Sequence, residues 1–239
     1  MSAAPEMALD PSLGLSSDLS FDLILASASP RRRELLQRLG LRLRLAPVDM
    51  DETPRAGERP GDCVRRLAAA KSEAAVAALT HSDADAVGTA QVVTVLAADT
   101  MVSLDGVIYG KPADAVEARA MLERLAGRRH EVTTAYRIWR GHAAAPADAR
   151  VVDRAVTTQV TFRLLQAAEI EAYAANGEWQ GKAGGYALQG IAGAFISELR
   201  GSHTNVIGLP VAEVLADLAA AGAIADYPRA AFGAPREGE

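Results

Sequence analysis

The sequence predicts an α/β protein built on a mixed β-sheet. Short apolar runs with the length or the alternation of strands are interleaved with helical segments, a pattern that is typical of this class. Some neighbouring strands are separated by an Asp-Gly turn and others by a whole helix, so hairpins and crossover connections both occur. With 239 residues, 49% of them apolar, the chain can bury one sizeable core or two closely joined lobes.

The first half of the chain alternates between strands and helices. A strand is expected at 21–26, and Ser29-Pro30 then opens a helix with a serine N-cap and proline at the first helical position. Gly40 ends this helix. The remaining elements of this half are strands at 41–45 and 92–98, a hairpin at 102–108, and helices at 61–79 and 113–125, with a polar insertion at 81–90.

The second half begins with two long β-rich runs, and its elements are expected in the order strand 131–139, loop 141–149, strand 151–164, helix 166–175, glycine-rich loop 181–190, strand 194–199 and helix 211–221. We place a single domain at 21–223. Residues 1–20 and 224–239 are expected to be disordered extensions, the second because it is rich in Pro, Gly and charge.

Composition excludes several classes of protein. The formal net charge of −5 argues against a broad nucleic-acid-binding surface. No apolar run is long enough to span a bilayer, and the first twenty residues lack the Lys or Arg of a secretory signal. The single cysteine, Cys63, cannot form an internal disulfide, which suits a reducing compartment. We therefore expect a cytoplasmic protein with neither nucleic acid nor membrane as a partner.

The first helix carries its charge at the wrong end. Its first turn holds Arg31, Arg32 and Arg33, whereas the partial positive charge of a helix N-terminus normally attracts acidic residues. Backbone amides, the hydroxyls of Ser27 and Ser29 and a guanidinium together make a phosphate site. The alternative is a solvated basic helix face, which a run of charge commonly is.

Asp99 follows the expected strand 92–98 directly, and ligands of open α/β folds gather at the carboxyl ends of strands. A carboxylate there can bind Mg²⁺ or activate a water molecule, or it can simply cap the next turn. Glu52, Lys71 and Lys111 are ambiguous by themselves, because exposed Glu and Lys usually have no special role.

The glycine-rich loop is the third candidate for a binding site. Four glycines within 181–190 indicate a close approach of the backbone to a ligand or left-handed turns, and the amide of Gln189 could read a base edge. A tight turn before the next strand is the plainer explanation. Neither a P-loop nor a Gly-x-Gly-x-x-Gly dinucleotide motif occurs in the chain.

Taken in order, these segments resemble one known family. Six short motifs carry the resemblance: Leu25 to Arg32, Asp51-Glu52-Thr53, Ala98-Asp99-Thr100, Gly110-Lys111-Pro112, Lys182 to Gly190, and Val206 to Pro210. The chain resembles the Maf family, the septum-formation-inhibitor-like nucleotide pyrophosphatases, from about Phe21 to Ala221. This resemblance implies a two-lobed α/β fold around a central cleft, related to the inosine-triphosphate pyrophosphatases, and hydrolysis of a nucleoside triphosphate to the monophosphate and pyrophosphate. It also implies a homodimer.

The resemblance assigns roles by position. The family's catalytic set matches Arg32, Glu52, Lys71, Asp99 and Lys111; its substrate-binding residues match Ser27, Ser29, Arg31, Arg32, Thr100, Lys182 and Gln189. Glu52 and Asp99 are the expected ligands of a divalent cation, Mg²⁺ or Mn²⁺, since an oxygen-rich set without a Cys or His cluster favours hard ions. Arg31, Thr100 and Gln189 resemble the branch that acts on dTTP and UTP rather than on N7-methyl-GTP.

Other functions remain open at this point. A non-catalytic nucleotide-binding regulator of septum formation could use the same cleft, although it would have no need of both carboxylates and both lysines. Hydrolysis of N7-methyl-GTP is a second alternative. A phosphotransferase is disfavoured because a Walker-type loop is missing. His203 stands where the family often has Tyr, and the segments 81–90 and 141–149 are longer than usual.

Overall fold

The computed structural model describes residues 21–82, 92–224 and 227. Within this part of the chain one seven-stranded mixed sheet has the order β2-β1-β3-β5-β6-β7, with β4 paired to β3. β1 runs parallel to β2 and β3, and the remaining pairs are antiparallel. The predicted mixed α/β class is confirmed. The strands are β1 Leu23–Ala26, β2 Leu43–Leu45, β3 Val92–Leu104, β4 Val107–Tyr109, β5 Arg129–His142, β6 Arg150–Phe162 and β7 Ile196–Arg200.

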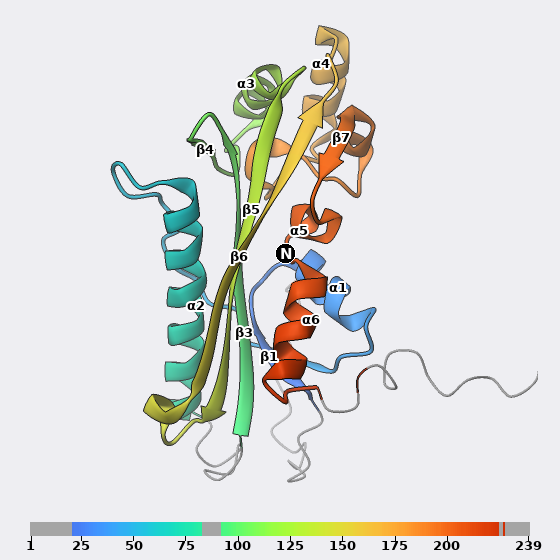
Figure 1. Cartoon of the computed structure of the whole chain (residues 1–239). Coiled ribbons are helices and arrows are strands. Elements are labelled where there is room, and N and C mark those ends of the chain that lie inside the picture. Colours follow the sequence, from blue (N-terminus) through green and yellow to red (C-terminus); the bar gives the residue numbers. More distant parts are fainter. Residues whose placement is uncertain (1–20, 83–91, 225–226, 228–239) are drawn as a thin grey trace, which may run out of the picture.

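Helices cover both faces of this sheet (Figure 1). They are α1 Pro30–Gln37, α2 Pro60–Ser82, α3 Ala115–Leu125, α4 Ala167–Asn176, α5 His203–Ile207 and α6 Val211–Ala220, with short 3₁₀ turns η1 Pro146–Asp148, η2 Ala183–Gly185 and η3 Ile191–Phe195. The long helix α2 packs against β3 and β5 from one side, and α1 and α6 cover the opposite side (Figure 1). None of the described helices is long and apolar enough to cross a membrane.

Strand alternation explains how one short strand supplies two cores. Leu23 and Leu25 of β1 join the cluster under α1 and α6, whereas Ile24 and Ala26 point to the opposite face and pack under α2. Successive side chains of a strand point to opposite faces, so a run that is apolar throughout is buried on both sides. These clusters form the first lobe.

The second lobe is built around the other ends of the three long strands. Its core contains Val102 of β3, Val132 of β5 and Phe162 of β6, together with α3, α4 and an edge-to-face aromatic group that includes Tyr186. β3, β5 and β6 therefore run through both lobes and join them, as Figure 1 shows. The predicted two-lobed arrangement is confirmed.

Two predictions about single elements are wrong, and one short helix was not predicted. β3 does not end at Ala98, because β5 pairs with it continuously through Asp99↔Ala135 and Thr100↔Thr134. The helix that was not predicted is α5, which Ser202 caps by accepting a hydrogen bond from the backbone of Asn205. The last strand begins at Ile196 and not at 194, since the preceding residues form η3.

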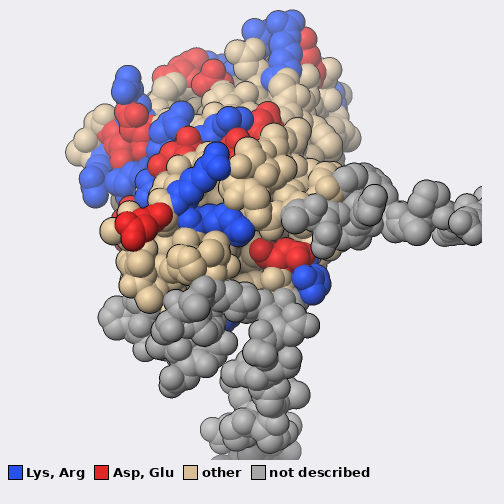
Figure 2. Space-filling view, turned by 60° about the horizontal axis from the view of Figure 1, so that its bottom comes forward, with Lys and Arg blue, Asp and Glu red and all other residues tan. Residues whose placement is uncertain are grey.

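Some predictions concern residues outside the described part. The segments 1–20, 83–91, 225–226 and 228–239 are not described, so the expected disordered ends and most of the polar insertion are not tested. Ile224, at the start of the expected tail, is buried in the core under α6. On the face seen in Figure 2, basic and acidic side chains are interspersed, without one broad basic surface.

Candidate functional site

A cavity of about 310 Å³ lies between the two lobes, and residues of both line it. Its walls contain every residue that the sequence assigned to the site: Ser27, Ser29, Arg31, Arg32, Glu52, Lys71, Asp99, Thr100, Lys111, Lys182 and Gln189. The first and last of these residues, Ser27 and Gln189, lie far apart in the chain, so their gathering is a property of the tertiary structure.

The cavity exists because β1 is short. β1 ends at Ala26, opposite Ala97, so β3 has no parallel neighbour beyond that point. After Ala98, the successive residues Asp99 and Thr100 of β3 point to opposite faces of the sheet at this gap. Asp99 accepts a hydrogen bond from Lys71 of α2, and Thr100 accepts one from Arg32 of α1. The site therefore lies at the carboxyl end of β1, where ligands of open α/β sheets are expected, but in the middle of β3.

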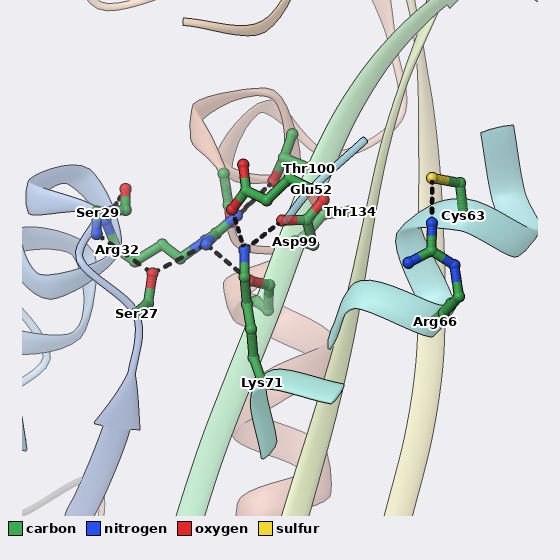
Figure 3. Close-up of polar contacts among 12 residues, drawn as sticks. Ser27, Ser29, Arg32, Glu52, Cys63, Arg66, Lys71, Asp99, Thr100 and Thr134 are labelled. Carbon is green, nitrogen blue, oxygen red and sulfur yellow. Dashed lines mark hydrogen bonds and ion pairs between the residues drawn. The ribbon is translucent and has the colours of Figure 1, made fainter. Parts of the chain in front are cut away.

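Lys71 lies at the centre of a charged cluster (Figure 3). Its side chain is buried, and Nζ lies 2.5 Å from Oε1 of Glu52 and 2.6 Å from Oδ1 of Asp99. Nζ of the exposed Lys111 lies 2.6 Å from the other oxygen of Glu52. Burial alone would raise the pKa of Glu52, but the hydrogen bonds from Lys111 and Lys71 outweigh it and lower the pKa to about 2. Glu52 is therefore ionised at neutral pH.

Arg32 is buried, and its guanidinium is held by four protein acceptors. Nε donates to the carbonyl oxygen of Gly208 at 2.8 Å, and Nη2 donates to Oγ1 of Thr100 at 2.9 Å. Nη1 donates to Oγ of Ser27 at 2.9 Å and to the carbonyl oxygen of Ala98 at 2.8 Å. These bonds commit four of the five N–H donors of the side chain. Arg32 thus ties α1 to β3 and to the turn before α6.

Thr100 belongs to a buried chain of hydroxyl groups. Thr134 donates its only hydroxyl proton to the carbonyl oxygen of Asn205 at 3.1 Å. The two threonine hydroxyls lie 2.9 Å apart, and that of Thr100 accepts from Arg32 and also lies 3.4 Å from the carbonyl oxygen of Gly208. Nothing in the sequence pattern pointed to Thr134, because a polar residue within a long strand gives no signal by itself.

The N-terminus of α1 is as the sequence predicted. Ser29 is its N-cap and accepts from the backbone N–H of Arg32, Pro30 follows, and the first turn contains no acidic residue. Arg31 is half-buried beside the cavity, and burial lowers the pKa of its guanidinium. Within the described residues Arg31 has no hydrogen bond or ion pair to a protein group, so its charge is available to an anion.

The glycine-rich loop closes the cavity from the second lobe. Gly184 and Gly185 both adopt left-handed backbone angles, and a Cβ on Gly184 would lie 3.0 Å from the side chain of Val102. The hydroxyl of Tyr186 is hydrogen-bonded to Nε2 of the buried His130 at 2.8 Å. Gln189 is exposed on the wall of the cavity. The left-handed turns predicted for the glycine-rich loop are therefore confirmed at Gly184 and Gly185.

Lys182 opens this loop with its ammonium turned partly towards the backbone. It donates to the carbonyl oxygens of Glu178 and Gln180. Burial, together with the nearby charge of Arg31, lowers the pKa of Lys182. An anion placed between Lys182 and Arg31 would stabilise the charged form of both side chains.

Several wall residues were not identified from the sequence. The apolar side chains of Val48, Val102, Val132 and Ile207 line the cavity together with Gly208. A valine within a strand has the same pattern whether it faces a core or a cavity, so periodicity cannot separate the two. Only the motif at 206–210 carried a signal for this part of the wall.

The donor set of the cavity fits a hard divalent cation. Among the described residues no group of three or more His, Cys, Asp and Glu side chains forms a complete metal site. Glu52 and Asp99 nevertheless converge, since both contact one ammonium group. Two carboxylates supply part of an octahedral oxygen shell, which Mg²⁺ commonly completes with water and substrate phosphate.

The model of the family described as Maf-like protein matches residues 22–221. A dTTP/UTP pyrophosphatase of Cereibacter sphaeroides is 51% identical over 84% of this chain and 95% of its own length. One from Sphingopyxis alaskensis is 49% identical, over 84% and 96%. A solved nucleoside-triphosphatase (dITP/XTP pyrophosphatase) from Mycobacterium abscessus covers 85% of this chain and 95% of its own, with 13% identity and a TM-score of 0.35.

Proposed function

The chain belongs to the family of Maf-like proteins, and from this premise we propose that it hydrolyses dTTP and UTP to the monophosphate and pyrophosphate. The observation that carries the proposal is the cluster of Lys71 with Glu52 and Asp99 inside a cavity rich in cations. Two carboxylates beside several lysines and arginines suit a polyanionic substrate whose hydrolysis needs an activated water.

Positive charge in the cavity holds the triphosphate. Lys111 is exposed, Lys71 is buried beside Asp99, and Lys182 lies on the opposite wall of the cavity. Ser27 and Ser29 stand at the start of α1, whose N-terminal amides favour an anion. Arg32 adds its charge and its remaining N–H, because its other four donors are bound to the protein.

Asp99 is the general base of the proposed reaction. Lys71 binds its Oδ1, and no described group binds Oδ2, which is left to accept a proton from water. The water oxygen forms a bond to the α-phosphorus, the bond from that phosphorus to the bridging oxygen breaks, and pyrophosphate leaves with the electron pair. Mg²⁺ or Mn²⁺ held by Glu52 and Asp99 would supply positive charge against the phosphate oxygens.

The base of the nucleotide is selected by Arg31, Thr100 and Gln189. All three line the same cavity, the first two beside α1 and β3 and the third on the glycine-rich loop. Buried polar groups discriminate strongly, because a wrong base leaves them unpaired. The Thr100→Gln variant should therefore change the relative turnover of dTTP and N7-methyl-GTP. We also infer a cytoplasmic homodimer from the family resemblance, and analytical ultracentrifugation tests the dimer.

Release of pyrophosphate from dTTP in the presence of Mg²⁺ is the direct test. The Asp99→Asn variant keeps the size of the side chain and loses its charge, so kcat should fall by about 10²-fold or more, the magnitude associated with general-base catalysis. Asp62→Asn is the matched control, since Asp62 pairs with Arg59 on the exposed surface of α2. Near-normal release by the Asp99 variant would refute the assigned role.

A nucleotide-binding regulator without catalytic activity is the competing function. It predicts that the wild-type protein binds dTTP, shown by calorimetry, and releases no pyrophosphate. It also predicts that Asp99→Asn binds at least as tightly, because a negative charge beside the phosphates has been removed. Multiple turnovers by the wild type would exclude it.

A further inference from the structure

The position of Gln189 depends on the backbone around it. Within the described residues its side chain has no hydrogen bond to the protein, although it lines the cavity. The turn that carries it is closed by a bond from the N–H of Gly190 to the carbonyl oxygen of Ala187. A flexible amide on an exposed turn can read a base only if the turn itself is fixed.

The carboxylate of Glu178 fixes the chain directly after Gln189. Oε2 accepts the backbone N–H of Ile191 at 2.9 Å, and Oε1 accepts the N–H of Ala192 at 3.3 Å and the hydroxyl of Tyr173 at 3.0 Å. Two of these donors belong to the first residues of η3, and the third comes from α4 in the core of the second lobe. Glu178 therefore connects the end of the loop to the buried side chain of Tyr173 on α4.

Gly190 leaves room for this carboxylate. A Cβ on Gly190 would lie 2.3 to 2.4 Å from the three carboxyl atoms of Glu178, closer than any atoms pack. Its backbone angles, φ −112° and ψ −156°, are accessible to any residue, so the conformation does not require glycine. The glycine adjacent to Gln189 is needed because Glu178 occupies the space.

We propose that Glu178 is a positioning residue that determines base discrimination by holding the turn of Gln189 against the cavity. Glu178 is not part of the cavity wall, so it acts through the backbone and not by touching the nucleotide. The inference rests on the proposed function for its substrate, a pyrimidine nucleoside triphosphate. It assigns the glycine-rich loop a fixed anchor at its C-terminal end, separate from the groups that hold the phosphates.

Glu178→Gln is the first variant of the test. The amide keeps the size of the side chain but turns an NH₂ group towards one of the three donors, so at least one bond is lost. The expected result is a KM for dTTP about tenfold higher with kcat within about threefold, and a smaller preference for dTTP over N7-methyl-GTP, in line with the loss of one charge-assisted hydrogen bond. Glu171→Gln, which removes an exposed ion pair on α4, is the matched control and should leave both values unchanged.

A double-mutant cycle with Gly190→Ala separates this role from general destabilisation. Alone, Gly190→Ala pushes the carboxylate away and should reproduce the raised KM. In a Glu178→Ala background the space is empty, so the same substitution should add less than about twofold, a non-additivity expected of residues in contact. Thermal unfolding of every variant is measured alongside, because lost stability would lower kcat for all nucleotides equally.

The affinity for α,β-imido-dTTP, which resists hydrolysis at the reacting bond, gives a second reading that does not depend on turnover. If the wild-type protein binds this analogue but releases no pyrophosphate from dTTP, the proposed function is refuted. The affinities of the variants for the analogue would still test the role of Glu178. Equal losses for dTTP and N7-methyl-GTP, unchanged affinity in Glu178→Gln, or additive effects in the cycle would overturn the inference.

Discussion

Replacing Arg32 with Lys separates a structural role from a catalytic one. The change keeps the positive charge near the phosphates and removes the planar guanidinium. Four acceptors surround that guanidinium at 2.8 to 2.9 Å. An ammonium is a single point with three donors and cannot reach acceptors on both sides of the fork.

The size of the effect follows from the bonds that are lost. If two of the four acceptors lose their donor, and each charge-assisted hydrogen bond contributes about 1.5 to 3 kcal/mol, the free energy of unfolding falls by about 3 to 6 kcal/mol. A domain of this length loses about 2 to 4 °C of melting temperature per kcal/mol, so Tm should fall by at least about 6 °C. The loss is a large fraction of a typical total stability of about 5 to 15 kcal/mol.

Urea unfolding followed by circular dichroism is the assay, with Arg31→Lys as the control. Arg31 lines the same cavity, and within the described residues no protein group binds it, so its variant should unfold at the wild-type midpoint. Both variants are also assayed for pyrophosphate release. An Arg32→Lys protein that unfolds at the wild-type midpoint but has lost its activity would refute the structural argument and leave Arg32 a purely catalytic residue.

Four further outcomes are expected. Lys111→Met removes a hydrogen bond that lowers the pKa of Glu52 to about 2, so the acidic limb of the pH–rate profile should move to higher pH. Burial lowers the pKa of His130 to about 4, so the protein should lose up to about 3 kcal/mol of stability as the pH falls from 6.5 to 4; His130→Gln should flatten this dependence in unfolding curves. Gly184→Ala forces a left-handed alanine against Val102 and should cost about 1 to 3 kcal/mol in the same assay. Treatment with EDTA should abolish pyrophosphate release, and added Mg²⁺ or Mn²⁺ should restore it.

Local signals predicted most of the elements and the start of the site. Ser29, Pro30 and the apolar spacing behind them predicted α1, and the Asp-Gly pair at 105–106 predicted the hairpin of β3 and β4. These signals act within a few residues, where the side chain and the backbone it caps are neighbours in the chain. The same locality explains why the predicted helix limits are close to those of the structure.

The prediction that a strand ends just before Asp99 was wrong because of pairing between distant strands. Two polar residues after an apolar run read as the end of a strand, yet β5 continues to pair with β3 past both of them. The gap beside β3 is created by the end of β1, more than 70 residues earlier. A pattern in one segment contains no information about where its neighbour stops.

The sequence by itself predicted the mixed α/β class and a set of polar residues that all line one cavity. The tertiary structure alone decided what each residue does there: Arg32 is bound on four sides, Lys71 joins two carboxylates, and Glu178 fastens the turn of Gln189. The physical reason is that membership follows from short motifs, whereas hydrogen-bond partners follow from contacts between segments that only the folded sheet brings together.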